Sequence, residues 1–273
     1  MHQENIPTIQ AAQNFYAHAA VTAIKDVSPH LRRFTFKAYG LKAVHFCRPG
    51  NHIKIFIPQP GSAEIALPDV SSGRPNWPDP TQKPVMRTYT LRKIDPGKEE
   101  LDIEFALHDD NNGAACAWAM LAKPGDLLGI GMKAGKTLRE ADWYFMGGDE
   151  TAIPAIAAML ESLPATATGM AYLEVDTPAD TFEIITRSAV QIRWLYRNGT
   201  RPEASRLLLQ ALQSAPLPAA AVSTRYVWVS AEAEVVKAVK QYAKNELLLQ
   251  REELHATVYW KAGESEDEYQ REK

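Results

Sequence analysis

The spacing of apolar residues changes near the middle of the chain, and this change constrains the fold most strongly. In the first half, short runs rich in β-branched and aromatic residues are separated by Pro, Gly, Asn or Asp, which is typical of strands. In NHIKIFI, Ile53, Ile55 and Ile57 alternate with other residues and fall on one strand face. About six such strands, interrupted by one short helix over 113–121, predict a small closed antiparallel barrel.

The second half follows a different pattern, in which strands alternate with helices. A strand over 143–147 precedes a helix over 151–162 and a second strand over 169–175. The same order returns with strands over 224–230 and 254–261 on either side of a helical segment. Strands that alternate with helices predict an open α/β domain with a mostly parallel sheet.

The length of the chain agrees with two domains, because 273 residues exceed the roughly 150 that one domain usually contains. We predict a first domain at 1–138 and a second at 139–273, which includes a charged C-terminal tail expected to be frayed. A Pro-rich segment over 58–84 is either a functional loop or a tolerated surface insertion.

Charge and composition exclude several classes of function. A formal net charge of -3 gives no electrostatic reason to expect a nucleic-acid partner. The chain has neither a secretory signal nor an apolar run of membrane-spanning length, so we expect a cytoplasmic protein with no membrane partner. Its two cysteines, Cys47 and Cys116, stand in unrelated contexts, and no protein-ligated metal is expected.

The segment PVMRTYTLR places two arginines around a tyrosine that is flanked by threonines. A strand that uses arginines for solubility explains this composition. A strand that binds a planar, polyanionic ligand explains it too, because a guanidinium makes strong charge-assisted bonds to phosphate oxygens. Arg87 and Tyr89 share one face of this strand, and Thr90 points to the other face.

Two further segments have features of a phosphate site. In LHDDNNGAACAWAM, small residues begin a helix whose first N–H groups are unsatisfied, so Gly113, Ala114 and Ala115 can admit a ligand closely. His108 suits a structural hydrogen bond as well as a cofactor contact. In GGDETAIPAI, two glycines follow a strand, but the spacing is not that of a dinucleotide fingerprint, and Asp149 puts negative charge where phosphate would lie.

The ordered set RTYTLR, HDDNNGAACAWA, GGDETAIPAI, YVWVSAEAEVVKAVK and VYWKAGESEDE resembles the siderophore-interacting proteins, over about residues 15–268. These are cytoplasmic FAD-dependent ferric-siderophore reductases of the ferredoxin reductase-like superfamily. One departure is the turn Asn112–Ala115, where the family commonly has a Gly-Pro-Ala type. The resemblance implies an N-terminal six-stranded antiparallel FAD-binding barrel and a nucleotide-binding-like second domain.

The resemblance also implies roles for individual residues. Cations near the flavin would steer an anionic ferric siderophore. The expected FAD contacts are Arg87, Thr88, Tyr89, Thr90, His108, Gly113, Ala114, Ala115, Asp149, Thr151 and Trp260. The expected substrate contacts are Lys54, Arg193, Arg197 and Lys261, although each is also explained as a solvated surface cation.

The electron donor stays open between NADH, NADPH and reduced ferredoxin. Glu174 and Asp176 follow or end a parallel strand, where an acidic side chain binds a ribose diol and repels a 2′-phosphate, so they favour NADH. The ferric siderophore is the expected substrate partner, ferredoxin is a possible protein partner, and a monomer is expected. A general flavin or ferredoxin-type reductase and a non-enzymatic siderophore-binding module are the alternatives.

Overall fold

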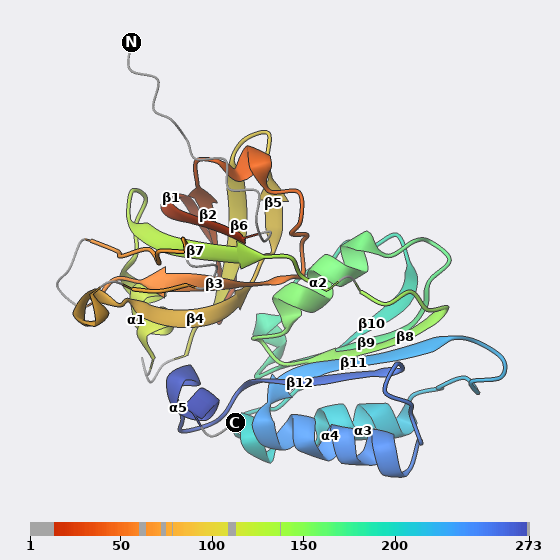
Figure 1. Cartoon of the computed structure of the whole chain (residues 1–273). Coiled ribbons are helices and arrows are strands. Elements are labelled where there is room, and N and C mark those ends of the chain that lie inside the picture. Colours follow the sequence, from red (N-terminus) through yellow and green to blue (C-terminus); the bar gives the residue numbers. More distant parts are fainter. Residues whose placement is uncertain are drawn as a thin grey trace.

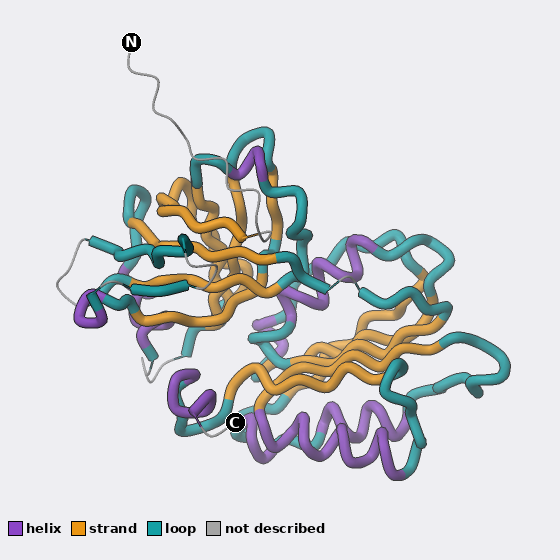
Figure 2. Tube along the Cα trace, in the orientation of Figure 1, coloured by secondary structure: helices purple, strands orange, loops and turns teal. Residues whose placement is uncertain are grey.

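The computed structural model describes residues 14–59, 64–71, 75–77, 79–108, 113–136 and 138–271. Two sheets lie beside one another, one antiparallel and curled, the other parallel and covered by helices (Figures 1 and 2). We call the first the barrel and the second the parallel sheet. Among the described residues, no helix is both long and apolar enough to span a membrane.

The barrel is a seven-stranded antiparallel sheet with the strand order β4-β3-β7-β1-β2-β6-β5. The segment that begins PVMRTYTLR, predicted as a single strand, is divided, which accounts for seven strands instead of six. At the division, the Leu91 N–H bonds to Asn51 beside β3, while the Arg92 N–H bonds to Asp102 of β6. The strands are β1 (Asn14–Ser28), β2 (Leu31–Lys37), β3 (His52–Ile57), β4 (Val85–Thr90), β5 (Lys93–Asp95), β6 (Glu100–Ala106) and β7 (Leu127–Lys133).

Alternating apolar residues build the interior of the barrel, as the sequence predicts. Ile53, Ile55 and Ile57 of β3 are all buried, and they join a core with phenylalanines of β2 and β6. Helix α1 (Ala114–Leu121) packs against this core, where the Trp118 ring lies 5.6 Å from that of Phe105. The helix that contains the expected phosphate turn is therefore held by the barrel core.

The Pro-rich segment packs against the barrel over the part that the structure describes. The Trp77 ring lies 5.9 Å from the Phe56 ring, and Ile65 is buried. A bridge joins Asp69 to Asn76, and a short 3-10 helix covers Pro80–Gln82. These contacts give the segment a packing role, while residues 60–63, 72–74 and 78 lie outside the described residues.

The parallel sheet has the order β10-β9-β8-β11-β12, and each of its pairs is parallel. Helix α2 covers one face, and helices α3 and α4 cover the other (Figure 1). Strand β10 and helix α3 are not expected from the sequence pattern. The elements are β8 (Trp143–Gly148), α2 (Ile153–Ser162), β9 (Thr168–Val175), β10 (Ala189–Tyr196), α3 (Leu207–Ser214), β11 (Arg225–Glu232), α4 (Ala233–Asn245) and β12 (Leu254–Trp260).

Polar contacts connect the barrel to the part of the chain that contains the parallel sheet. Arg92 donates to Glu161 of α2 at 2.9 Å, and its side chain is only 10% exposed. On another side, His30 of the β1–β2 turn lies 2.7 Å from the buried Asp180 carboxylate. These contacts fix the orientation of two surfaces that face each other across a cleft.

Candidate functional site

A cleft of about 2550 Å³ lies between the barrel and the parallel sheet, and it reaches the carboxyl ends of the parallel strands as well as their amino ends at Asp142 and Thr224. In open α/β sheets, ligands bind at the carboxyl ends of the strands. Most residues predicted for the site line the cleft: Lys54, Arg87, Thr88, Tyr89, Thr90, His108, Gly113, Ala115, Thr151, Arg197, Trp260 and Lys261. Ala114, Asp149 and Arg193 are not among the lining residues, and the positions of Asp149 and Arg193 are described below.

Strand β4 presents a row of hydrogen-bond donors to the cleft. It is the last strand in the order of the barrel sheet, so its outer N–H groups have no strand partner. The Thr88 N–H and hydroxyl donate to Glu266 at 2.7 and 2.6 Å, and Arg87 donates to Asp267 at 2.8 Å. Lys54, which faces Thr88 across the sheet, donates to Glu266 at 2.8 Å.

Within this donor set, Arg87 fits the diphosphate of a dinucleotide cofactor. The Asp267 oxygen stands in for a phosphate oxygen, because both are anionic acceptors that a guanidinium binds at hydrogen-bond distance. At the start of α1, Gly113 has a φ of 110°, and among the described residues beyond its chain neighbours no atom lies within 4 Å of the position that a Cβ would take. The backbone there is open to a ligand, so both predicted phosphate contacts face the cleft.

The remaining barrel residues of the site differ in their packing and in how exposed they are. Tyr89 packs against Phe105 with ring centroids 4.4 Å apart, and burial raises the pKa of its phenol. Thr90 is buried, while His108 is exposed at the end of β6. The His108 N–H donates to the Cys116 sulfur at 3.5 Å, which connects the end of the strand to α1.

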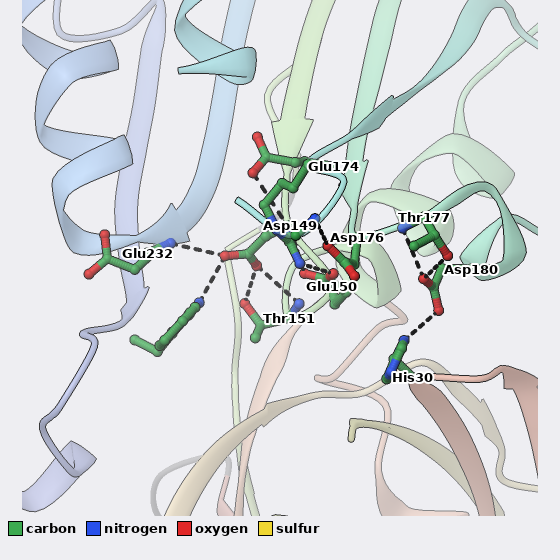
Figure 3. Close-up of polar contacts among 12 residues, drawn as sticks. His30, Asp149, Glu150, Thr151, Glu174, Asp176, Thr177, Asp180 and Glu232 are labelled. Carbon is green, nitrogen blue, oxygen red and sulfur yellow. Dashed lines mark hydrogen bonds and ion pairs between the residues drawn. The ribbon is translucent and has the colours of Figure 1, made fainter. Parts of the chain in front are cut away.

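The Asp149 carboxylate organises the opposite wall of the cleft, where β8, β11 and β12 end (Figure 3). Its oxygens accept from the Thr151 hydroxyl at 2.6 Å, the Glu232 N–H at 3.0 Å and Trp260 Nε1 at 2.8 Å. Burial raises the pKa of Asp149, although these hydrogen bonds oppose the shift. Asp149 therefore holds Thr151 and Trp260 in place, and it fills the position where a pyrophosphate would meet free N–H groups.

Arg197 belongs to a buried ionic cluster and not to an open basic rim. Its guanidinium donates to Glu150 at 3.0 and 2.5 Å and lies 3.7 Å from Glu174. The Arg197 side chain is only 7% exposed. Burial raises the pKa of Glu174 to about 7, while the hydrogen bond from Ser205 and the charge of Arg197 oppose the shift. Arg197 lines the cleft while its charge is paired with Glu150 and Glu174, and its role as a substrate cation stays a prediction.

The geometry also bears on two other expectations, a substrate contact at Arg193 and a ribose contact at Glu174. Arg193 is exposed on β10, the edge strand farthest from β12, and it is not a lining residue of the cleft. Glu174 is 2% exposed and faces Arg197, so it does not present a carboxylate to a ribose. Asp176 does line the cleft, where it accepts from the Gly199 N–H at 2.8 Å.

Two features of the site were missed from the sequence. Lys133 at the end of β7 lines the cleft. Burial lowers the pKa of His52, and the charges of Lys133 and Lys54 lower it further. The expected frayed tail contains helix α5 (Glu266–Arg271), which lies against β4. The signal was Ser265 followed by Glu268, a capping box in which the Ser265 N–H donates to the Glu268 carboxylate at 2.8 Å and the Glu268 N–H donates to the Ser265 hydroxyl at 3.3 Å.

Comparison with known proteins agrees with this arrangement of a barrel and a parallel sheet. Residues 20–136 match the siderophore-interacting FAD-binding domain, and residues 141–263 match the siderophore-interacting protein family. Ferric vibriobactin reductase ViuB of Vibrio cholerae is 35% identical over 91% of this chain and 90% of its own length. The chain belongs to the siderophore-interacting protein family.

Further relatives support the same assignment. The crystal structure of the siderophore-interacting protein SipS from Aeromonas hydrophila superposes with a TM-score of 0.81 at 36% identity, over 95% of this chain and 97% of that one. The NADPH-dependent ferric-chelate reductase of Escherichia coli is 29% identical over 78% of this chain and 80% of its own. The predicted fold class and the predicted cofactor, FAD, are thereby confirmed.

Proposed function

We propose that this protein is an FAD-dependent reductase that converts a ferric siderophore to its ferrous form and so releases iron in the cytoplasm. The donor row of Arg87, Thr88 and Lys54 at the mouth of an interdomain cleft is the observation that carries the proposal. The names of the Vibrio and Escherichia relatives support the reaction class. Siderophores bind Fe(III) far more tightly than Fe(II), so reduction weakens the chelate.

FAD supplies the electron chemistry when it is bound, and the protein's residues position and shield it. Arg87 and the open backbone at Gly113 hold the diphosphate by charge-assisted and N–H hydrogen bonds. Tyr89, held against Phe105, offers an aromatic contact, and Thr90 provides a hydroxyl on the neighbouring face. Trp260 is fixed by Asp149 on the opposite wall. No acid or base residue is required for the iron step, since the transfer is of electrons.

The cleft is large enough to admit a bulky chelate beside the cofactor. The cations that line it outside the diphosphate site include Lys54, Lys133 and Lys261. They favour the approach of an oxygen-rich ferric complex, whose chelator supplies all the ligands of the iron. Electron transfer from the flavin then requires proximity more than a closely fitted pocket.

We extend the proposal to the electron donor, the domain limits, the location and the oligomeric state of the protein. A nicotinamide nucleotide, as in the name of the Escherichia relative, enters from the side of the parallel sheet. The Asp149 carboxylate weakens a pyrophosphate site there, so reduced ferredoxin is retained as the alternative donor. We further propose domains at 1–138 and 139–273, and a cytoplasmic monomer.

An anaerobic titration followed by visible absorbance tests the reductase assignment. NADH, NADPH and reduced ferredoxin are added in separate runs to the yellow protein, and a ferric siderophore is added afterwards. We expect one donor to bleach the flavin and the chelate to restore its colour. A reduced flavin that ignores ferric chelates but reduces free flavin indicates a general reductase, and a colourless protein that binds the chelate indicates a binding module.

Replacement of Lys261 by alanine is expected to slow the reduction of an anionic ferric siderophore without loss of flavin. Lys261 follows Trp260 directly and lines the cleft. Stopped-flow oxidation of the pre-reduced protein by the chelate measures the effect, and we expect roughly a 3- to 10-fold lower rate from the lost attraction. A rate equal to that of the unmodified protein would assign Lys261 to the surrounding surface.

A further inference from the structure

The segment that follows β12 turns back toward the barrel and places three carboxylates against cations of the cleft. Glu264 pairs with Lys261, Glu266 with Lys54, and Asp267 with Arg87. A bridge between Lys261 and Glu264 closes the turn, and α5 follows it beside β4 (Figure 1). This acidic segment, Glu264–Asp267, connects the last strand of the parallel sheet to the edge of the barrel.

Glu266 is the best-held carboxylate of the acidic segment. Its oxygens accept from Lys54 Nζ, the Thr88 hydroxyl and the Thr88 N–H at 2.8, 2.6 and 2.7 Å. Burial opposes its ionisation, but the hydrogen bonds from Lys54 and Thr88 outweigh burial and hold its pKa below the usual value. The side chain is 19% exposed. Glu266 is thus a stable internal anion at the position where Lys54 would meet a ligand.

These contacts offset part of the positive charge of the cleft wall. The cations that line the cleft include Lys54, Arg87, Lys133 and Lys261, and the acidic segment contributes carboxylates to three of these four. A strongly anionic ligand must displace a carboxylate before it can bind Lys54 or Lys261. A neutral or cationic complex meets no such competition, and it gains attraction from the same carboxylates.

We propose that Glu266, with Glu264, sets the charge preference of the substrate site by competing with anionic chelates for Lys54 and Lys261. The inference rests on the proposed function, which places the chelate in this cleft. It assigns the acidic segment a role in specificity. Ferric complexes of low net negative charge bind most readily, and highly anionic complexes bind only when they displace the carboxylates from Lys54 and Lys261. Specificity then arises from a repulsive group placed beside the attractive ones.

The test measures binding separately from reduction, with gallium(III) in place of iron(III), because gallium chelates have the same charge but accept no electron. The probes are a triply anionic gallium tris-catecholate and a gallium trihydroxamate that carries one protonated amine and is therefore singly cationic. Equilibrium dialysis against the flavin-loaded protein gives both dissociation constants for the unmodified chain and for Glu266→Gln. Glu234→Gln is the control, because Glu234 lies on α4, is not a lining residue of the cleft, and gives the same change in net charge.

We expect Glu266→Gln to bind the anionic complex roughly 10-fold more tightly, since one charge-assisted hydrogen bond is worth about a tenfold change in an equilibrium constant. The cationic complex should bind equally or more weakly, and Glu234→Gln should change neither constant. The gain should diminish at high ionic strength, where charge interactions are screened. If Glu266→Gln loses flavin or fails to fold, Glu264→Gln takes its place with the same expected direction.

The proposal would be overturned by no change for the anionic complex, by weaker binding of it, or by an equal gain for both complexes. The last result would make the acidic segment a barrier without charge selectivity. Absence of binding by either complex to every variant would also overturn it. Failure of the reductase assignment is seen separately, in the anaerobic titration with ferric chelates, because the gallium measurement requires no electron transfer.

Discussion

Replacement of Arg87 by alanine is expected to lower the affinity for FAD by roughly 10- to 100-fold, the effect of losing one or two hydrogen bonds to a charged group. Arg87 lies on β4 at the cleft, where its guanidinium already binds an anionic oxygen of Asp267 at 2.8 Å. The diphosphate of FAD presents the same kind of acceptor. Titration of deflavinated protein with FAD, followed by the quenching of flavin fluorescence, measures the dissociation constant.

Two matched variants make this result specific. Arg193→Ala removes an exposed arginine of β10 outside the cleft lining, so it should leave the FAD affinity unchanged. Asp267→Asn should act in the opposite direction to Arg87→Ala, because it frees the guanidinium from an internal competitor. Unaltered FAD affinity in Arg87→Ala would remove Arg87 from the diphosphate site, and weaker binding in Asp267→Asn would show that the α5 contact supports the cofactor.

The parts of the site that are local in sequence could be predicted from sequence alone. The alternation of Ile53, Ile55 and Ile57 identifies a strand, and the neighbouring Arg87 and Thr88 form a donor row within one strand. The α/β pattern of the second half likewise follows from apolar spacing. These features depend on neighbours a few residues away, where period and turn chemistry determine the conformation.

The parts of the site that depend on distant residues could not be predicted. Arg197 has the appearance of a surface cation in sequence, yet its partner Glu150 lies 47 residues earlier, at the end of a different strand. Asp149 and Trp260 are separated by 111 residues and meet only because β8, β11 and β12 end at one edge of the sheet. Burial of that edge determines the roles of these charges. Burial of individual residues depends on contacts that are distant in sequence, so a single sequence does not reveal it.

Strand β10 and helix α5 were missed for local reasons. β10 is an edge strand whose outward positions include the exposed Gln191 and Arg193, so its apolar signal is diluted. Helix α5 is short and highly charged, and its stability depends on the Ser265–Glu268 cap and on contacts with β4. Acidic composition alone favours a solvated tail, and only the tertiary contacts reverse that expectation.

Replacement of Arg197 by methionine is expected to destabilise the protein by about 3–5 kcal/mol at neutral pH, because it leaves buried carboxylates without their cation. Glu150 and Glu174 both lose their partner, and Asp149 loses a nearby positive charge. Methionine keeps much of the volume, so the loss reports on charge more than on packing. Urea unfolding followed by circular dichroism at several pH values measures it, with Arg193→Met as the exposed control.

The pH dependence identifies the cause of that loss. Burial raises the pKa of Glu174 from 4.5 to about 7 in the folded protein, so the folded state binds more protons than the unfolded state between these values. Stability therefore falls as the pH rises through this window, and it is independent of this group below 4.5, where both states are protonated. Without Arg197, the folded pKa values rise further and the decline continues to higher pH.

The destabilisation caused by Arg197→Met should thus be small in acid and largest above neutrality. Adding Glu174→Gln to this variant removes one buried carboxylate that has lost its cation, and it should recover part of the stability at neutral pH but little in acid. A loss that is the same at every pH would instead assign Arg197 a packing role. Because the cluster supports the wall that holds Asp149, Thr151 and Trp260, flavin fluorescence of the loaded variant should change in the same pH range.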